Sequence, residues 1–133
     1  MQLLEHIHVN VDSIRATEHF LAAALPGFTV RGGGEDSSYG KWLHIGSATS
    51  YIALTEVSGA RSMRNLRHIG LQVDDVDVLV SRLSDAGYEP SDSSALDVHP
   101  FRRRVYYVDA NGLHWEFVQY LSEDPALRND YSH

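Results

Sequence analysis

One stretch near the end of the chain decides the fold: His99–Val118 reads HPFRRRVYYVDANGLHWEFV. Arg103–Val108 and Leu113–Tyr120 are rich in β-branched and aromatic residues, a composition typical of strands. Between them, Asp109–Gly112 (DANG) contains an Asn-Gly pair, which is a strong hairpin signal. We therefore predict two antiparallel strands joined by this turn.

Side chains alternate across a strand, so the predicted hairpin has two faces. Tyr106 and Glu116 should share one face. The other should carry the large apolar side chains, which are Val105, Tyr107, Trp115 and Phe117. A carboxylate in the middle of a strand is costly to bury without a partner. Although an exposed Glu on a solvated face is the common case, Glu116 is therefore a candidate functional residue.

Composition limits the class of protein. A chain of 133 residues is about one ordinary domain. The absence of cysteine excludes disulfides, thiolate metal sites and a cysteine nucleophile, and the net charge of −7 disfavours a nucleic-acid partner. No apolar run reaches membrane-spanning length and no signal peptide opens the chain, so we expect a cytoplasmic protein without a membrane partner. Eight histidines make metal or proton chemistry a natural hypothesis.

The chain also repeats itself. Leu4–Ile14 (LEHIHVNVDSI) aligns without gaps with Leu66–Val76 (LRHIGLQVDDV), which pairs His6 with His68. Both segments alternate as strands do, and an amphipathic pattern typical of a helix follows each one. The first helix should begin near residues 12–13 and end at residues 26–27. The second should begin near residues 74–75 and end at Gly87.

The remaining strands continue the repeat. Lys41–Gly46 matches Arg104–Asp109, and Ser50–Val57 matches Leu113–Tyr120. Short extended pieces at residues 28–30 and 88–90 complete two βαβββ modules, with predicted loops at residues 32–38 and 92–94. We expect residues 1–60 and 61–121 to form these modules within one structural domain, joined by a linker at residues 58–64. Residues 122–133 should be a polar tail.

This duplication resembles the vicinal oxygen chelate superfamily, which includes glyoxalase I, bleomycin-resistance proteins, fosfomycin-resistance transferases and extradiol dioxygenases. The specific segments are EHIHVNV, RHIGLQV and DANGLHWEF, and the resemblance covers about residues 3–120. It implies an α+β fold in which the two modules pack together, with mixed curved sheets enclosing a cavity and helices outside. It also implies a homodimer, in which one site is shared between subunits or closed within one chain.

The resemblance implies a metal site. The first and last strands of each half supply ligands in this family, which here gives His6, His68 and Glu116. The fourth position falls at Ala53, which cannot bind a metal, so a standard glyoxalase I is disfavoured. Two histidines and one carboxylate suit Fe(II) or Mn(II), with Zn or Ni also possible. The implied cofactor is one divalent metal ion.

Among the branches of the family, the order of His99, Tyr106, Asp109, Gly112 and Glu116 resembles that of extradiol ring-cleaving dioxygenases. This implies catalytic roles for Tyr106 and His99. Departures from the pattern are Ala110 in place of a proline, Asp97 in place of a small residue, and a length of one domain where two copies are common. We read the basic cluster at residues 102–104 as a solvated strand edge.

Two classes of function remain open. The first is a metal-dependent enzyme acting on a small chelating oxygenated substrate, closest to a dioxygenase, with a glyoxalase-like lyase or isomerase or a thiol transferase as alternatives. The second is a resistance-type protein that binds a compound without turning it over. Either would use a cavity that tolerates aromatic groups, lined by His8, Trp42, His44, Tyr51 and Ala53.

Overall fold

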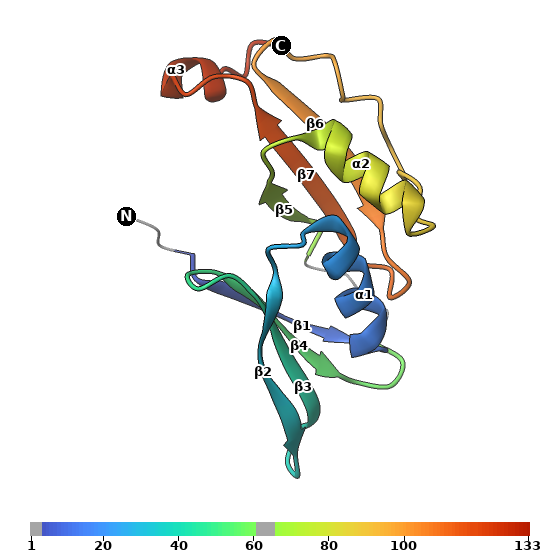
Figure 1. Ribbon diagram of the computed structural model, residues 1–133. Helices are drawn as coiled ribbons and strands as arrows, with labels where there is room; N and C mark the ends of the chain where they lie inside the picture. The colour runs from blue at the N-terminus through green and yellow to red at the C-terminus, as the bar shows by residue number, and fades with distance from the viewer. Residues whose placement is uncertain (1–3, 61–65) are drawn as a thin grey trace. The chain divides into compact units, whose positions relative to one another are not determined.

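The computed structural model describes residues 4–60 and 66–133, and the chain divides into two compact units, Met1–Ser62 and Met63–His133. Each unit holds one copy of the repeat and is described by itself below (Figure 1). The predicted linker at residues 58–64 lies partly outside the described residues.

The first unit contains one sheet and one helix. Its elements are β1 (His6–Val11), α1 (Ile14–Ala24), β2 (Thr29–Asp36), β3 (Gly40–Gly46) and β4 (Tyr51–Glu56). The strands lie in the order β1-β4-β3-β2. β1 pairs with β4 in parallel, and the other neighbours are antiparallel. The predicted βαβββ order is therefore present in this half.

Helix α1 covers the apolar face of this sheet. Its N-cap is Ser13, whose hydroxyl accepts a hydrogen bond from the Ala16 N–H at 3.2 Å and so satisfies a free helix donor. The helix packs against β3 and β4. Its buried residues are Thr17, Phe20, Leu21 and Ala24. One face of the sheet is thus closed by α1, and the other carries the polar and aromatic residues.

The glycine run at residues 32–34 is not the predicted loop but part of β2. Gly32 pairs with His44, Gly33 with Leu43 and Gly34 with Trp42. Glycine weakens a strand because its backbone loses much entropy on ordering. Here the pairing with β3, which is continuous from Gly32 to Asp36 after an irregularity between Val30 and Gly32, outweighs that local preference.

The second unit has one strand fewer. Its elements are β5 (Ile69–Gln72), α2 (Val76–Asp85), β6 (Arg102–Val108), β7 (His114–Tyr120) and α3 (Pro125–Arg128). The strand order is β5-β7-β6, with β5 parallel and β6 antiparallel to β7. The α+β class and the repeated strand–helix–strand plan predicted from the sequence are confirmed.

The strand predicted at residues 88–90 is absent, so this half is βαββ. Only an isolated bridge between Asp92 and Tyr106 remains in its place. Pro90 lacks an N–H, and the polar residues that follow it form turns. The side chain of Asp92, for example, accepts a hydrogen bond from the Ser94 N–H at 2.8 Å.

The predicted hairpin forms, and a buried aspartate organises its turn. One carboxylate oxygen of Asp109 accepts hydrogen bonds from the N–H groups of Asn111 and Leu113, at 2.9 and 3.0 Å. The other accepts from the Trp115 indole N–H at 3.2 Å. Gly112 has φ +80°, a conformation that favours glycine. Asp109 is thus a structural residue of this turn.

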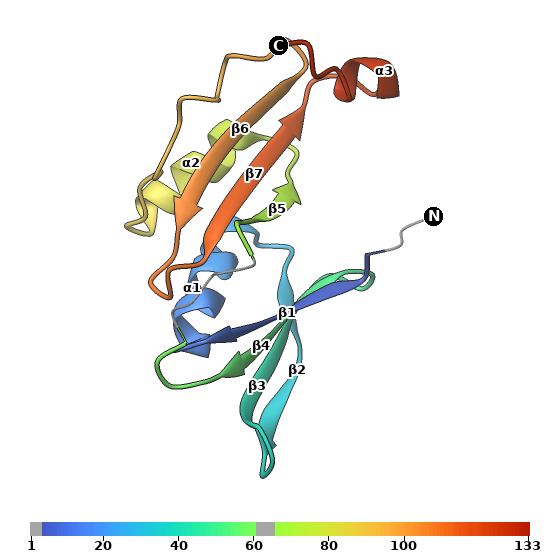
Figure 2. The ribbon, with the colours of Figure 1, turned by 180° about the vertical axis from the view of Figure 1, so that it is seen from behind.

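The two faces of the hairpin are those predicted by alternation. Val105, Tyr107, Trp115 and Phe117 are all buried. Helix α2 packs on this face, against β6 and β7, and the two opposite views place it on the same side of the sheet (Figures 1 and 2). The opposite face carries Tyr106 and Glu116, which are partly exposed.

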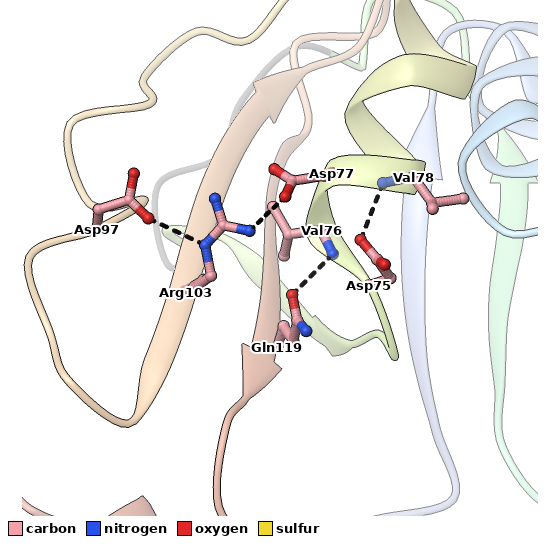
Figure 3. Close-up of polar contacts among 7 residues, drawn as sticks. All are labelled: Asp75, Val76, Asp77, Val78, Asp97, Arg103 and Gln119. Atoms are coloured by element: carbon pink, nitrogen blue, oxygen red, sulfur yellow. Dashed lines mark hydrogen bonds and ion pairs between the residues drawn. The ribbon is translucent and has the colours of Figure 1, made fainter.

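Polar contacts hold α2 in place (Figure 3). Asp75 caps the helix by accepting the Val78 N–H at 3.0 Å, and the Gln119 side chain of β7 accepts the Val76 N–H at 3.0 Å. Arg103 of β6 donates to Asp77 of α2 at 2.7 Å and to Asp97 of the preceding loop at 3.1 Å.

The repeat is out of step by one residue in the match of Lys41–Gly46 with Arg104–Asp109. His44 pairs with Ala53 in the first unit, and Tyr106 pairs with Glu116 in the second. His44 therefore corresponds to Tyr106, not to Tyr107 as the sequence alignment implied. The first hairpin leaves residues 47–50 between paired strands, whereas the second leaves residues 109–113, one residue more. A slip of one residue exchanges the two faces of a strand.

The predicted polar tail is folded against the second unit. It contains α3, which begins after the N-cap Asp124. Arg128 lies 4.2 Å from the centroid of the Tyr120 ring and donates to Gln72 at 3.1 Å. The backbone carbonyl of Asp130 is also bonded, as described below.

Candidate functional site

Glu116 occupies the centre of the second sheet, because β7 lies between β5 and β6. Its side chain is 16% exposed, and each carboxylate oxygen has a partner. Oε1 accepts a hydrogen bond from the Tyr106 hydroxyl at 2.9 Å, and Oε2 lies 2.9 Å from His68 Nε2. The structure thus brings three of the predicted site residues together at one point.

The spacing of His68 and Glu116 suits neighbouring ligands of one metal ion. Ligand atoms ~2.1 Å from a metal and at a right angle to each other lie ~3.0 Å apart. The 2.9 Å between Nε2 and Oε2 is the length of a hydrogen bond or ion pair, and it is also compatible with that spacing. A β-carbon added to Gly70, the residue opposite Glu116 on β5, would lie 3.9 Å from Oε2, so Gly70 leaves this side of the carboxylate open.

Tyr106 stays protonated beside this carboxylate. Burial raises the pKa of its phenol above the ordinary value, and the hydrogen bond to Glu116 and the negative charge there raise it further. The hydroxyl therefore acts as a donor at neutral pH, as the contact with Oε1 requires.

A polar cavity of about 410 Å³ opens beside these groups. Its lining includes His68 and Tyr106, together with Arg67, Ser91, Asp92, Ala95 and His114. Sequence reasoning missed most of this wall, because residues 91–95 reach the site through the bridge of Asp92 to Tyr106. No local pattern signals such a contact.

The corresponding row of the first sheet is His8, Ala53 and His44, which lie opposite one another on β1, β4 and β3. Ala53 is only 2% exposed, and its methyl group lies between the two imidazole-bearing positions. His8 Nε2 lies 2.7 Å from the buried Thr55 hydroxyl. Burial lowers the pKa of His44, and the electrostatic effect of the nearby His8, His6 and Arg31 side chains lowers it further. His44 therefore favours the neutral imidazole.

His6 belongs to the same face of the first unit. Its ring stacks on Tyr51 at 4.6 Å between centroids, and Tyr51 stacks in turn on His44 at 4.8 Å. Nδ1 of His6 lies 2.9 Å from a carboxylate oxygen of Glu5, which is the type of contact that orients a metal-binding imidazole. Its Nε2 is then the atom suited to bind a metal.

The predicted set of three ligands is thus divided between the units. His68 and Glu116 are paired in the second, and His6 lies in the first. Across residues 4–60 and 66–133, no three His, Asp or Glu side chains are grouped so as to hold a metal ion. The complete set of three ligands stays a prediction, and the two that are paired, His68 and Glu116, have suitable donor atoms.

The first unit also has a cavity, of about 530 Å³. It contains three of the five predicted pocket residues, namely His8, Trp42 and His44. Its remaining lining is Asn10, Tyr39, Thr55 and Val57. Asn10 and Thr55 continue the alternation that carries His8 and Ala53, so this signal was present in the sequence. The other two predicted pocket residues, Tyr51 and Ala53, are not among the residues that line it, although Tyr51 stacks on His44.

His99 lies in a different environment from the one predicted. It is 5% exposed, and its Nδ1 accepts the Phe101 N–H at 3.0 Å. Its Nε2 lies 2.9 Å from the Asp130 carbonyl, which also accepts a hydrogen bond from Arg102 at 3.1 Å. Both ring nitrogens are therefore occupied, Nδ1 by the adjoining backbone and Nε2 by the tail, and His99 is not among the residues that line the cavity beside Tyr106.

The arginine cluster is likewise not the solvated edge that we expected. Arg102 is buried against the tail, and Arg103 joins β6 to α2 and to Asp97. Asp97, which departs from the dioxygenase pattern, is thus an ion-pair partner here. Because Arg102 and Arg103 are held by groups outside their own strand, the cluster has a structural role.

The two sheets, the repeated plan and a central carboxylate paired with a histidine define the class of fold. The family model that describes the glyoxalase/bleomycin resistance protein/dioxygenase superfamily matches residues 3–117. The chain belongs to this superfamily, and the resemblance seen in the sequence is confirmed.

Solved structures with the same fold include proteins of different roles. TnmS3, an antibiotic binding protein from Streptomyces sp. CB03234, is 20% identical with a TM-score of 0.70, over 90% of this chain and 97% of that one. The fosfomycin resistance protein FosX from Listeria monocytogenes, complexed with Mn(II) and sulfate, is 19% identical with a TM-score of 0.70, over 98% and 99%. A glyoxylase/bleomycin resistance protein/dioxygenase domain from Frankia sp. EAN1pec is 19% identical, with a TM-score of 0.71, over 90% and 98%.

At these identities the likeness shows the fold alone. A comparison with curated protein sequences found no match. Within the described part of the chain, no helix has the length and apolar character needed to cross a membrane.

Proposed function

We propose that the protein is a divalent-metal-dependent enzyme that acts on a small chelating oxygenated substrate. The observation that carries this proposal is the pairing of His68 Nε2 with Glu116 Oε2 at 2.9 Å, on an open sheet face beside a cavity. His6, His68 and Glu116 would hold one metal ion. Fe(II) or Mn(II) suits two imidazoles and a carboxylate, with Zn or Ni as alternatives.

When bound, the metal supplies a Lewis acid and a template for two vicinal oxygens of the substrate. The residues of the chain provide the rest. The hydrogen bond from Tyr106 fixes one oxygen of Glu116, which leaves the other to face His68. Because its pKa is raised, Tyr106 also keeps a proton available for a substrate oxygen in the cavity that it lines.

For the reaction, we propose extradiol ring cleavage first, because of the order of Tyr106, Asp109, Gly112 and Glu116 along the hairpin. His99 was the second catalytic candidate, and its contacts with Phe101 and Asp130 support a structural role instead. Glyoxalase-like lyase or isomerase activity and thiol transfer are the alternatives within the same chemistry.

A homodimer, with His6 of one subunit completing the site of the other or with each site closed within one chain, is part of this proposal. It accounts for the division of the ligands between two units. A monomer that binds metal at full stoichiometry in solution would exclude the shared version.

A second candidate function is non-catalytic binding of a small molecule. It is favoured by the first unit's cavity, whose wall is largely aromatic and apolar. TnmS3, which is described as an antibiotic binding protein, shares the fold. Ligand binding of equal strength with and without metal, together with no turnover, would support it.

The test begins with elemental analysis of protein purified without chelators, which should show about one divalent ion per chain. Anaerobic reconstitution with Fe(II), followed by exposure to air and a panel of catechols, should then give the yellow ring-opened product. Turnover of a different chelating substrate would move the assignment to the lyase or transferase branches, and protein that binds no divalent ion would exclude the proposal.

A further inference from the structure

The cavity of the second unit has one positive and one negative side chain in its wall. They are Arg67 and Asp92, and the other lining residues are neutral or carry imidazoles. The cavity of the first unit differs, because no Asp, Glu, Lys or Arg is among the residues that line it. Neither Arg67 nor Asp92 belongs to the proposed metal site, so both are available to recognise another part of a ligand.

The backbone holds Asp92 beside Tyr106. The Tyr106 N–H donates a hydrogen bond to the Asp92 carbonyl at 2.9 Å, within an antiparallel bridge between the two residues. Residues directly opposite each other in an antiparallel pair have side chains on the same face. Because Glu116 pairs with Tyr106 from the other side, on β7, the phenol lies between two carboxylate-bearing residues. After burial and Glu116, the charge of Asp92 also raises the pKa of Tyr106.

The Asp92 side chain is oriented, and it is charged at neutral pH. One of its oxygens accepts the Ser94 N–H at 2.8 Å, and hydrogen bonds from Ser94 lower the pKa of this carboxyl. Among the residues that the structure describes, no cation forms an ion pair with it. A fixed negative charge without a positive partner therefore lies in the cavity wall.

Arg67 supplies the positive charge, directly before His68 in the chain. Its side chain is exposed, and a guanidinium stays protonated throughout the pH range of folded proteins. Within residues 4–60 and 66–133, it has no hydrogen bond or ion pair, whereas Arg103 holds both Asp77 and Asp97. The guanidinium of Arg67 is thus available to a ligand in the cavity.

Two opposite charges in one polar cavity favour a ligand that carries both signs. A simple anion would be attracted by Arg67 but repelled by Asp92, and a simple cation would meet the reverse. Ser91 and His114, which also line the cavity, add neutral groups that can form hydrogen bonds.

We infer that this cavity takes a zwitterionic substrate, in which a carboxylate pairs with Arg67 and an ammonium group pairs with Asp92, as an amino acid would provide. The inference rests on the proposed function, because it concerns the part of the chelating substrate that does not touch the metal. Arg67 and Asp92 are then determinants of specificity and take no part in the chemical step.

The experiment compares four catechols that share one ring and differ in charge. L-DOPA has both charges, dopamine has only the ammonium group, 3-(3,4-dihydroxyphenyl)propionate has only the carboxylate, and 4-ethylcatechol has neither. Calorimetric titration at neutral pH under nitrogen, with Zn(II)-loaded protein and then with metal-free protein, measures affinity without turnover. We expect L-DOPA to bind roughly fivefold more tightly than either singly charged compound, as one partly exposed ion pair allows, and 4-ethylcatechol to bind most weakly.

Two substitutions test the two charges separately. Arg67→Gln should remove the advantage of L-DOPA over dopamine, and Asp92→Asn should remove its advantage over the propionate. The asparagine keeps an oxygen that can accept the Ser94 N–H, so the turn is retained. The controls are Arg15→Gln and Asp85→Asn, at exposed positions that do not line the cavity, and they should leave the order of affinities unchanged.

Equal affinity for the four compounds, or no binding by any of them, would overturn the inference. A preference for only one of the two charges would also overturn it, as would a preference for L-DOPA that survives both substitutions. The order of affinities needs no turnover, so the expected order without a ring-opened product would refute the proposed reaction and leave the charged cavity standing. Ring opening of all four compounds with equal affinity would refute only this inference.

Discussion

The two units carry different chemistry at the same point of the same topology. In each, a central strand pairs in parallel with the first strand and antiparallel with the preceding one. In the first unit the central residue is Ala53, flanked by His8 and His44. In the second it is Glu116, flanked by Gly70 and Tyr106. The small residue is therefore central in the first unit, whereas in the second it lies beside the central residue.

This difference shows that the backbone sets where a functional group lies and the side chain sets what it does. The second unit combines a central carboxylate with a bare glycine on one side and a phenol donor on the other, which suits a cation. The first has the methyl group of Ala53 between the His8 and His44 imidazoles, with the Trp42 indole beside His44. This arrangement suits an aromatic ring.

Replacing Glu116 by Gln removes the carboxylate from the central row of the second unit, as the first unit has none in its own row. Loss of an outer residue of a metal site typically costs 10–100-fold in affinity, so removal of a ligand should cost more than about 100-fold. Elemental analysis after dialysis against a weak chelator measures this. The control is Glu123→Gln, whose side chain is 98% exposed. Wild-type stoichiometry in Glu116→Gln would show that Glu116 is not a ligand.

On the buried faces, Ile45 of the first unit corresponds to Tyr107 of the second. Burial raises the pKa of Tyr107 to about 12, with a smaller contribution from Glu89. An unfolded tyrosine titrates near about 10, so the folded state holds this proton more tightly. Its contribution to stability is therefore complete below about pH 10 and is lost as the pH rises toward 12.

Over that window the loss amounts to roughly 2 kcal/mol. Tyr107→Phe should remove this part of the alkaline sensitivity, which urea unfolding at pH 8 and at pH 11.5 measures. Tyr39→Phe, at an exposed position, is the matched control. A variant that loses as much stability as the wild type between these two pH values would contradict the assignment to Tyr107.

Gly70→His gives the second unit the residue that the first has at this position, His8. A β-carbon at residue 70 fits, at 3.9 Å from Glu116 Oε2, but an imidazole would crowd the carboxylate and His68. We expect metal affinity to fall about tenfold, as for other changes next to a ligand. Competition with a fluorescent chelator measures it, and Gly70→Ala should be nearly neutral. Unchanged affinity in Gly70→His would mean that the open side of Glu116 is not used.

The smallest effect concerns a pair of strand cations, Lys41 and Arg103, at corresponding positions. Lys41 Nζ lies 3.9 Å from a carboxylate oxygen of Glu56, whereas Arg103 holds Asp77 and Asp97 at shorter distances. The hydrogen bond from Arg103 lowers the pKa of Asp77, so this contribution is present above about pH 4 and is lost as the pH falls below it.

Asp77→Asn should therefore lower the thermal midpoint slightly at pH 7, and the difference from wild type should shrink between pH 5 and pH 2. Asp85→Asn, at the end of the same helix, serves as the control. A difference that grows on acidification would have the wrong sign for this ion pair.

Where the local sequence pattern agreed with the strand pairing of the folded chain, the sequence was sufficient to predict the structure. The hairpin from Arg102 to Tyr120 and its two faces followed from composition and alternation, because a strand with one buried face must alternate. The N-caps at Ser13 and Asp75 were found to within a residue for a similar reason, since only certain side chains satisfy free helix donors.

Elsewhere the local pattern misled. Residues 32–34 read as a loop but form a strand, residues 88–90 read as a strand but do not pair, and His99 read as a substrate contact but anchors the tail. The partners of residues 32–34 lie on the next strand, at residues 42–44, and the partner of His99 is Asp130, 31 residues along the chain. Residues 88–90 stay unpaired because Pro90 lacks an N–H and polar residues that form turns follow it.

By itself, the sequence determined the duplicated α+β plan, the two faces of the hairpin from Arg102 to Tyr120 and the choice of Glu116 as the central acid. These features follow from the periodicity of each segment and from the internal repeat, and both can be recognised in the sequence without knowledge of the fold. Only the tertiary structure decided that His68 and Tyr106 contact that acid, that Gly32 and Gly34 lie beside Trp42, and that one extra hairpin residue aligns His44 with Tyr106. Such contacts depend on strand register and loop length, which are set by packing and hydrogen bonding across the sheet.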